Sequence, residues 1–270
     1  MINRIITTCN AGLKGKISKI IKPKAMSCNK LVSSPIVDEF IRMPAKIVKK
    51  CFPDFEVKTQ YFKNYQEYIE KVSPIQKVRH QKRMELFASK IKPKPRIVPE
   101  KQMKAIDMIQ WETGEYCKVQ TKLKEGLSLN EAEEKFLKFI TESMEKTTEP
   151  KTLWRFVTPY ESFCEQIKTG EIKFNGMSST ASQYTDFFEF WESCNKKIID
   201  GKLAIQEGYM FKINVKPGTP ILDCNAIHKP PIGKTHLPRM SDEVILPEGK
   251  GLVQKIDEDL KIIEVDFYPN

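Results

Sequence analysis

The sequence predicts an α+β domain in which helices come first and two small, mostly antiparallel sheets follow around a cleft. Two observations predict this order. From Glu100 to Met144, apolar residues recur at helical spacing, whereas after Pro150 they form short runs that Gly, Pro and polar turn residues separate. With 270 residues, of which 40% are apolar, the chain has room for one large domain and an appendage.

Positive charge is concentrated near the start of the chain. The first 100 residues carry 22 Lys and Arg against 8 Asp and Glu, a net charge of +14, and the other 170 carry 23 against 27, a net charge of −4. Residues 1–35 contain no acid, and Leu13, Ile17 and Ile20 fall at helical spacing among lysines. Such a segment suits a targeting or export signal, a membrane-surface anchor, a nucleic-acid contact or a poorly ordered basic tail.

Composition argues against several classes of protein. No run approaches the roughly 18 apolar residues of a membrane helix, and the start of the chain lacks the apolar segment of a secretory signal peptide. The seven Cys are scattered without a CxxC pair, and there are only three His, so neither a disulfide framework nor a metal site is expected. We therefore expect a soluble protein, made in the cytoplasm, that needs no metal ion.

Alternating lysine and proline at residues 92–96 predict a stiff, exposed linker. It divides the chain into a basic N-terminal region, residues 1–97, and a second domain, residues 98–270. Within the first, residues 52–87 mix basic and aromatic side chains, which can bind nucleic acid. A small helical core is the favoured interpretation, because no RNP-like pattern or stacking repeat accompanies them.

Helices are expected at the start of the second domain. The helical period that begins at Ala105 is broken near Gly114 and then resumes. Ser128 and Glu131 have the spacing of a capping box, which predicts a further helix up to Met144.

Beyond Pro150 most of the elements are strands. A short helix is expected at residues 160–167, and a second, followed by a Lys-rich turn, around Phe187. The hydroxyl triplet Ser178–Thr180 and the segment Gly249–Gly251 are typical of turns. Strands are predicted at residues 153–157, 172–177, 209–215, 220–222, 244–246, 252–256 and 261–267, with a polar loop at 225–239.

Two charged positions stand beside apolar strands. Asp242 and Glu243 lie where the polar loop enters Val244–Leu246, and alternation along a strand places one acid on the side of Ile245 and the other on the side of Val244. An acid there is either a solvated strand start or a carboxylate aimed into a cleft. Arg155 lies between large apolar residues, so its side chain either faces solvent or is directed at an anion in a cleft.

The order of three motifs resembles the mono-ADP-ribosyltransferase family of the arginine-serine-glutamate class, which includes bacterial toxins and effectors. The motifs are Arg155 among aromatic residues, the triplet Ser178–Thr180, and Glu243 followed by aliphatic residues and a proline. The resemblance covers about residues 100–270, including the helical segment at residues 109–123. It implies an ADP-ribosyltransferase-like fold around an NAD cleft, and an enzyme of the glycosyltransferase class that transfers ADP-ribose from NAD.

The resemblance implies three catalytic residues. Glu243 would stabilise the oxocarbenium-like charge on the ribose and hold a ribose hydroxyl. Arg155 would bind a dinucleotide phosphate through its planar fork. Ser178 would hydrogen-bond Glu243 or the nicotinamide ribose. NAD is thus a substrate, and the chemistry requires no metal.

The resemblance also implies contacts around the cofactor. Phe156, next to Arg155, would hold the nicotinamide carboxamide through its backbone. An aromatic residue after the triplet often covers the nicotinamide, and Phe187 is the candidate, with Tyr184 and Phe188 as alternatives.

Acceptor recognition is implied for Ser241, two positions before Glu243. Members that modify arginine usually have Glu there, so we expect a protein acceptor other than arginine, or hydrolysis of NAD alone. The chain would then be a secreted effector or toxin in virulence, exported without a cleaved signal peptide, with residues 1–50 contacting an acidic membrane surface or a chaperone and no nucleic acid. The alternative is a catalytically silent module of this fold whose basic N-terminal region binds nucleic acid or a membrane.

Overall fold

The computed structural model describes residues 49–86, 95–110, 114–158, 161–183, 196–227 and 242–270. All of them belong to one compact unit, Met43–Asn270. The basic segment at residues 1–48, the expected helix around Phe187, and the candidates Tyr184, Phe188 and Ser241 lie outside the described residues.

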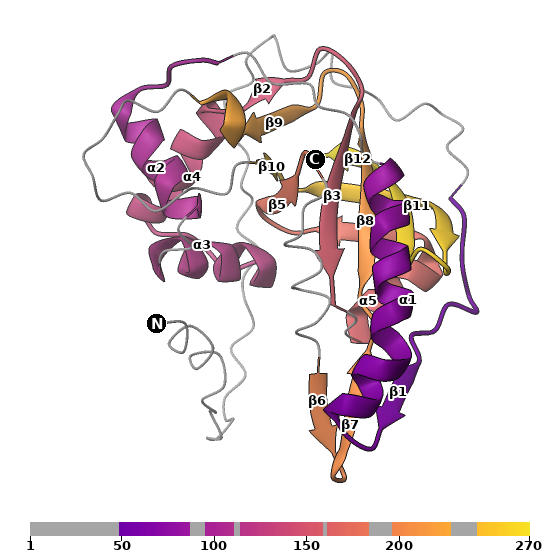
Figure 1. Cartoon of the computed structure of the whole chain (residues 1–270). Coiled ribbons are helices and arrows are strands. Elements are labelled where there is room, and N and C mark those ends of the chain that lie inside the picture. The colour runs from indigo at the N-terminus through magenta and orange to yellow at the C-terminus, as the bar shows by residue number, and fades with distance from the viewer. Residues whose placement is uncertain (1–48, 87–94, 111–113, 159–160, 184–195, 228–241) are drawn as a thin grey trace. The chain divides into compact units, whose positions relative to one another are not determined.

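The fold class is α+β, as predicted (Figure 1). The described elements, in chain order, are β1 (Thr59–Phe62), α1 (Tyr65–Leu86), α2 (Glu100–Gln110), α3 (Gly114–Glu125), α4 (Glu131–Glu142), β2 (Glu145–Lys146), β3 (Lys151–Val157), α5 (Glu161–Thr169), β4 (Glu171–Phe174), β5 (Ser178–Ala181), β6 (Lys196–Ile199), β7 (Lys202–Gln206), β8 (Tyr209–Val215), β9 (Pro220–Asp223), the 3-10 turn η1 (Cys224–Ala226), β10 (Glu243–Leu246), β11 (Gly249–Asp257) and β12 (Ile262–Pro269).

The larger sheet has nine strands in the order β2-β9-β10-β5-β3-β8-β12-β11-β4. Adjacent strands in this sheet are antiparallel, except for β8 and β12, which are parallel. Two parts of this sheet meet at β3, which pairs with β8 along its whole length but with β5 only at Trp154 and Ala181. The described strands therefore form two mostly antiparallel sheets, as predicted, and the larger one is joined by a narrow seam at β3.

The smaller sheet, β1-β7-β6, carries α1 on one face. Phe62 and Tyr68 are buried there against Leu203 and Ile205 of β7. Because β1 pairs with β7, more than 130 positions later in the chain, the segment that precedes residue 98 packs within the same compact unit. The expected division at 97/98 does not coincide with a boundary between compact units.

Helix α1 is anchored by two buried arginines. The Arg79 guanidinium donates to Glu207 Oε1 at 3.0 Å and to the carbonyl of Asp259 at 3.0 Å. Arg83, with none of its surface exposed, donates to the carbonyls of Leu260 and Lys261 at 2.8 and 3.3 Å. Long-range contacts therefore hold this basic helix in the fold.

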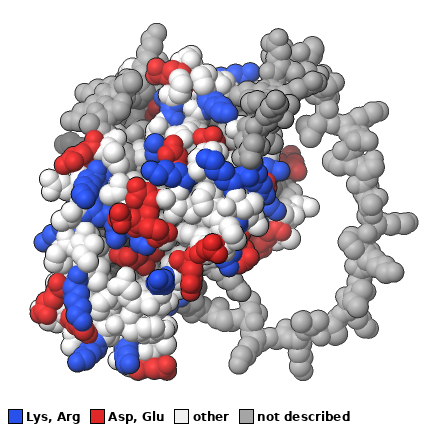
Figure 2. Space-filling view, turned by 90° about the vertical axis from the view of Figure 1, so that its right-hand side faces the viewer, with Lys and Arg blue, Asp and Glu red and all other residues white. Residues whose placement is uncertain are grey.

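Charge on the surface is mixed. Figure 2 shows Lys and Arg interspersed with Asp and Glu on the face turned toward the viewer. Among the described residues, Glu171 illustrates this mixture, since Lys49 and Lys250 approach its carboxylate to 3.6 and 3.8 Å. Exposed pairs of this kind contribute about 1 kcal/mol or less each.

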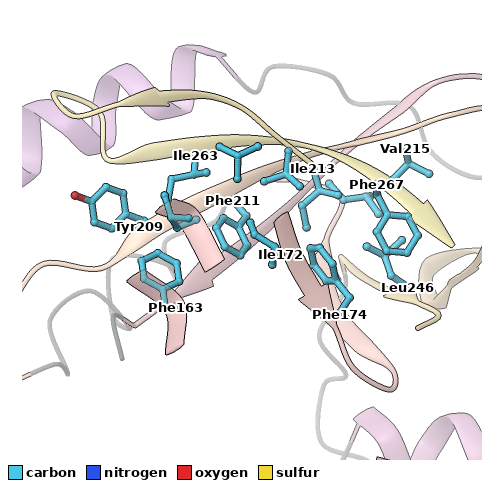
Figure 3. Packing of buried hydrophobic residues seen from close by; sticks show 14 of the residues in the cluster. Phe163, Ile172, Phe174, Tyr209, Phe211, Ile213, Val215, Leu246, Ile263 and Phe267 are labelled. Atoms are coloured by element: carbon cyan, nitrogen blue, oxygen red, sulfur yellow. The ribbon is translucent and has the colours of Figure 1, made fainter. Parts of the chain in front are cut away.

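Two large hydrophobic clusters lie on the nine-stranded sheet. In the first, α5 packs Phe163 against Phe211, with ring centroids 5.9 Å apart, and Phe174 meets Phe267 edge to face at 5.3 Å (Figure 3). The second cluster joins α2, α3 and α4 to Leu222 and Ile245 of β9 and β10. Helices α2, α3 and α4 therefore pack directly against the strand that carries Glu243.

The capping box of α4 lies two residues later than expected. Asn130, not Ser128, is the N-cap: its Oδ1 accepts from the Glu133 N–H at 2.9 Å, and Glu133 Oε2 accepts from the Asn130 N–H at 2.8 Å. Asn and Ser are about equally good N-caps, and Ser128 with Glu131 has the same spacing as Asn130 with Glu133. The N-cap preferences of the residues therefore could not show which of the two capping boxes forms.

Three segments that the sequence predicted as turns are strands. Ser178–Thr180 lies in β5, and Gly249–Gly251 begins β11, where a Cβ on Gly249 would come within 2.7 Å of the Phe267 ring. The Lys-rich turn is the hairpin β6–β7, whose tip residues Asp200 and Gly201 have φ of 49° and 73°. Positive φ at both tip residues is what a two-residue hairpin of type I′ requires.

Candidate active site

Glu243 begins β10 and is a buried carboxylate. It lies opposite Ala181 of β5, and only 7% of its surface is exposed. Alternation along β10 places it on the face of Ile245, which lies opposite Ser179, so Glu243 and Ser179 are diagonal neighbours on one face. Asp242, just before the strand, is half-buried. The structure thus assigns the buried acid to Glu243.

Ser179 holds this carboxylate. Its Oγ donates to Glu243 Oε1 at 2.7 Å, a short, charge-assisted hydrogen bond. The sequence had pointed to Ser178 for this contact, but Ser178 lies opposite Leu246 and is buried on the other face of the strand pair. The hydroxyl that contacts Glu243 therefore belongs to Ser179, because strand alternation separates the faces of adjacent residues.

Arg155 reaches the same serine. It is half-buried in the middle of β3, and its guanidinium donates to the Ser179 carbonyl at 3.1 Å. Ser179 therefore accepts from Arg155 with its backbone and donates to Glu243 with its side chain. The structure brings a cation and a carboxylate from distant parts of the sequence to one residue of β5.

Apolar residues border this arrangement. Trp154 lies opposite Ala181, so it shares the face of Ser179 and Glu243, and it packs in a cluster with Met210. Phe156 is half-buried against the same cluster, and its ring occupies the place that a side chain on residue 208, a glycine, would need. Carboxylate, hydroxyl and aromatic groups are therefore adjacent on one face of the sheet.

Sequence reasoning missed Ser179 for an identifiable reason. If Ser178–Thr180 is interpreted as a strand and not as a turn, its alternation places Ser179 with Ala181, apart from the buried Ser178 and Thr180. Thr180 confirms this alternation, because its Oγ1 donates to the buried carbonyl of Val244 at 2.6 Å. Phe187 and Ser241, the other two candidates, lie outside the described residues.

Metal-ligand clusters and membrane-spanning helices are both absent from the described residues. Over the described part of the chain, no group of three or more His, Cys, Asp or Glu is arranged as ligands of a metal ion. None of the described helices combines the length and the apolar character needed to cross a bilayer.

A scan against protein-family models finds no match, and neither does a search of curated proteins. Among solved structures, the chain is similar to Plx2a, an ADP-ribosyltransferase toxin from Paenibacillus larvae, with a TM-score of 0.44 and 12% identity over 74% of this chain and 96% of that chain. It is also similar to the Clostridium limosum C3 exoenzyme, with a TM-score of 0.44 and 16% identity over 72% and 94% of the two chains. A third is the ADP-ribosylating toxin BECa of C. perfringens, with a TM-score of 0.42 and 11% identity over 73% and 48%.

All three TM-scores are below 0.5, and the identities are 11–16%. The activity of this chain therefore has to be argued from its own residues.

Proposed function

We propose that this chain transfers ADP-ribose from NAD to a protein acceptor. The observation that carries the proposal is the meeting of Arg155 and Glu243 at Ser179, through hydrogen bonds of 3.1 and 2.7 Å. A guanidinium suits the pyrophosphate of a dinucleotide, and a buried carboxylate suits a sugar that becomes positively charged.

In the proposed reaction, the bond between nicotinamide and the ribose breaks while the acceptor atom bonds to the ribose carbon. Nicotinamide leaves as a neutral molecule, and the acceptor releases its proton. Positive charge grows on the ribose as the bond breaks, as in glycoside hydrolysis, and Glu243 stabilises it. Because the nitrogen of NAD already carries the positive charge that makes it a good leaving group, no Lewis acid has to be invoked.

Each residue has a distinct task. Glu243 stabilises the ribose, and burial strengthens the effect because little water screens the charge. Ser179 fixes the orientation of the Glu243 carboxylate, the task that sequence reasoning had given to Ser178. Arg155 binds a phosphate of NAD through its planar fork.

The remaining contacts extend this proposal. Phe156 would hold the nicotinamide carboxamide through its backbone, and the support is that it adjoins Arg155 and packs against the apolar cluster of Trp154. Phe187 as a cover for the nicotinamide, and Ser241 as the residue that recognises a non-arginine acceptor, rest on the sequence motifs alone.

The biological setting is proposed on the same basis. We place the chain among secreted effectors or toxins, with residues 1–50 contacting an acidic membrane surface or a chaperone. The support is the absence of acids in residues 1–35 and the positive charge of the first 100 residues.

Labelled NAD tests the function. Incubated with a cell lysate, the parent chain should attach label to protein, and Glu243→Gln, which keeps the shape of the side chain, should abolish it. Asp242→Asn is the matched control: it removes the adjacent, half-buried acid and should leave transfer unchanged. Persistent transfer by Glu243→Gln would contradict the proposal. Binding of NAD by a parent chain that turns nothing over would favour the silent module.

A further inference from the structure

A side chain of helix α3, Gln120, forms two hydrogen bonds with the chain immediately before β5. The amide nitrogen of Gln120 donates to the carbonyl of Met177, and the Met177 N–H donates to Gln120 Oε1 at 3.2 Å. Gln120 thus satisfies both polar groups of one residue's backbone, as a neighbouring strand would. We call this pair of hydrogen bonds the Gln120 clamp.

The chain around the Gln120 clamp is closely fitted. Gly176 has φ of 70°, and a Cβ there would lie 2.9 Å from Leu123 Cβ and 3.0 Å from Gln120 Oε1. Only glycine combines that conformation with so close an approach of α3. Met177 is 2% exposed and packs in the same cluster as Val119 of α3. The backbone of Met177 is therefore hydrogen-bonded to α3, and its side chain packs with α3.

The fastened segment leads directly to the candidate site. Ser179, which contacts Arg155 and Glu243, is two residues beyond Met177. Strand β5 has four residues and pairs with β3 only at Ala181. A strand so short, and so weakly joined on one side, depends for its position on β10 and on the segment that precedes it.

We propose that Gln120 is a positioning residue of the transferase site: through Met177 it sets the position of β5, and so the contact of Ser179 with Glu243. This inference rests on the proposed function. Gln120 hydrogen-bonds the backbone of Met177, two residues before Ser179, and acts through that backbone. Helix α3 is then part of the machinery that holds the carboxylate in place.

Gln120→Met tests the inference, because methionine has a similar length and cannot form the clamp. Hydrolysis of NAD by the purified chain should show kcat lowered on the order of tenfold, with KM for NAD within about twofold, because a small misplacement near the reacting centre costs mainly turnover. Lys122→Gln is the matched control: it breaks the α3–α4 contact to Glu133 at 2.7 Å, so it should lower the melting temperature and leave kcat unchanged. A Gln120→Met chain that melts at a lower temperature but keeps its kcat would overturn the inference.

Amide hydrogen exchange gives a second readout that needs no activity. In Gln120→Met, the amides of Met177 and of β5 should exchange on the order of tenfold faster, whereas Lys122→Gln should leave them unchanged. Unchanged protection in Gln120→Met would refute the clamp. If the parent chain does not turn NAD over, the proposed function fails and exchange alone decides whether the clamp exists. If the parent chain turns NAD over and Gln120→Met matches it in both readouts, the clamp and the positioning inference fail while the proposed function stands.

Discussion

Ser179 donates its hydroxyl hydrogen to Oε1 of Glu243 at 2.7 Å, across the antiparallel pair of β5 and β10. The same residue accepts from Arg155 through its carbonyl. Ser179 is therefore the point at which two charged groups, 88 positions apart in the chain, are held relative to each other.

The two adjacent serines should behave differently. Ser179→Ala removes the hydrogen bond that orients Glu243, so NAD turnover should fall by roughly ten- to a hundredfold. Ser178→Ala changes a buried hydroxyl on the opposite face and should affect turnover far less. Kinetics of the two purified variants, compared at equal folded concentration, provide the measurement. A larger loss in Ser178→Ala would show that the register of β5 and β10 differs from the one described.

Arg155→Lys keeps the positive charge but loses the planar fork. Because a lysine ammonium cannot bind a phosphate through two parallel hydrogen bonds, KM for NAD should rise by roughly tenfold, equivalent to about 1.4 kcal/mol. Lys151→Arg on the same strand, at the end that pairs with Val215, is the control and should leave KM unchanged. Unaltered KM in Arg155→Lys would exclude a bidentate phosphate contact.

The stability of the α3–α4 contact should depend on pH. A hydrogen bond from Lys122, followed by one from the backbone of Asn130, holds the pKa of Glu133 below its ordinary value of 4.5. A folded pKa below the unfolded one means that this contribution is complete above 4.5 and is lost as pH falls through the folded pKa.

The variant Glu133→Gln preserves the shape of the side chain and cannot titrate in this range. Melting temperatures measured over about pH 3 to 6 should therefore decline less steeply for Glu133→Gln than for the parent chain. Equal slopes would show that the ion pair of Lys122 and Glu133 adds nothing to the stability of the fold, as is found for many ion pairs near the surface.

Helix α1 should be required for the stability of the domain. Arg83→Met leaves the carbonyls of Leu260 and Lys261 without this donor in the interior, which should lower the free energy of unfolding by about 2–4 kcal/mol. Lys82→Gln, at the exposed neighbouring position, should change it by about 0.5 kcal/mol or less. Urea denaturation of both variants makes the comparison.

A shortened chain extends the same test. One that begins at residue 98 lacks β1 and α1, so it should expose the apolar residues of β7 and unfold at a lower temperature than one that begins at residue 43. Equal stability of the two chains would support residue 98 as a domain boundary.

Local patterns in the sequence determined much of the fold. Period-two alternation predicted β8, and a short apolar run between turn residues predicted β10, because burial of one or both faces of a strand leaves a direct mark on residue order. The order of Arg155, the hydroxyl triplet and Glu243 led to the proposed class of site through its resemblance to a known family, and these residue types suit the chemistry of NAD. In the same way, apolar residues at helical spacing predicted the helices between Glu100 and Met144.

Only the tertiary structure decided how these parts meet. The choice of Ser179 over Ser178 depends on the register between β5 and β10, and the incorporation of α1 depends on contacts such as Arg79 with Glu207, 128 positions apart. Such pairings leave no local pattern, because both partners are ordinary polar residues until the chain brings them together. A shift of one residue in register would exchange the two serines without altering a single letter of the sequence.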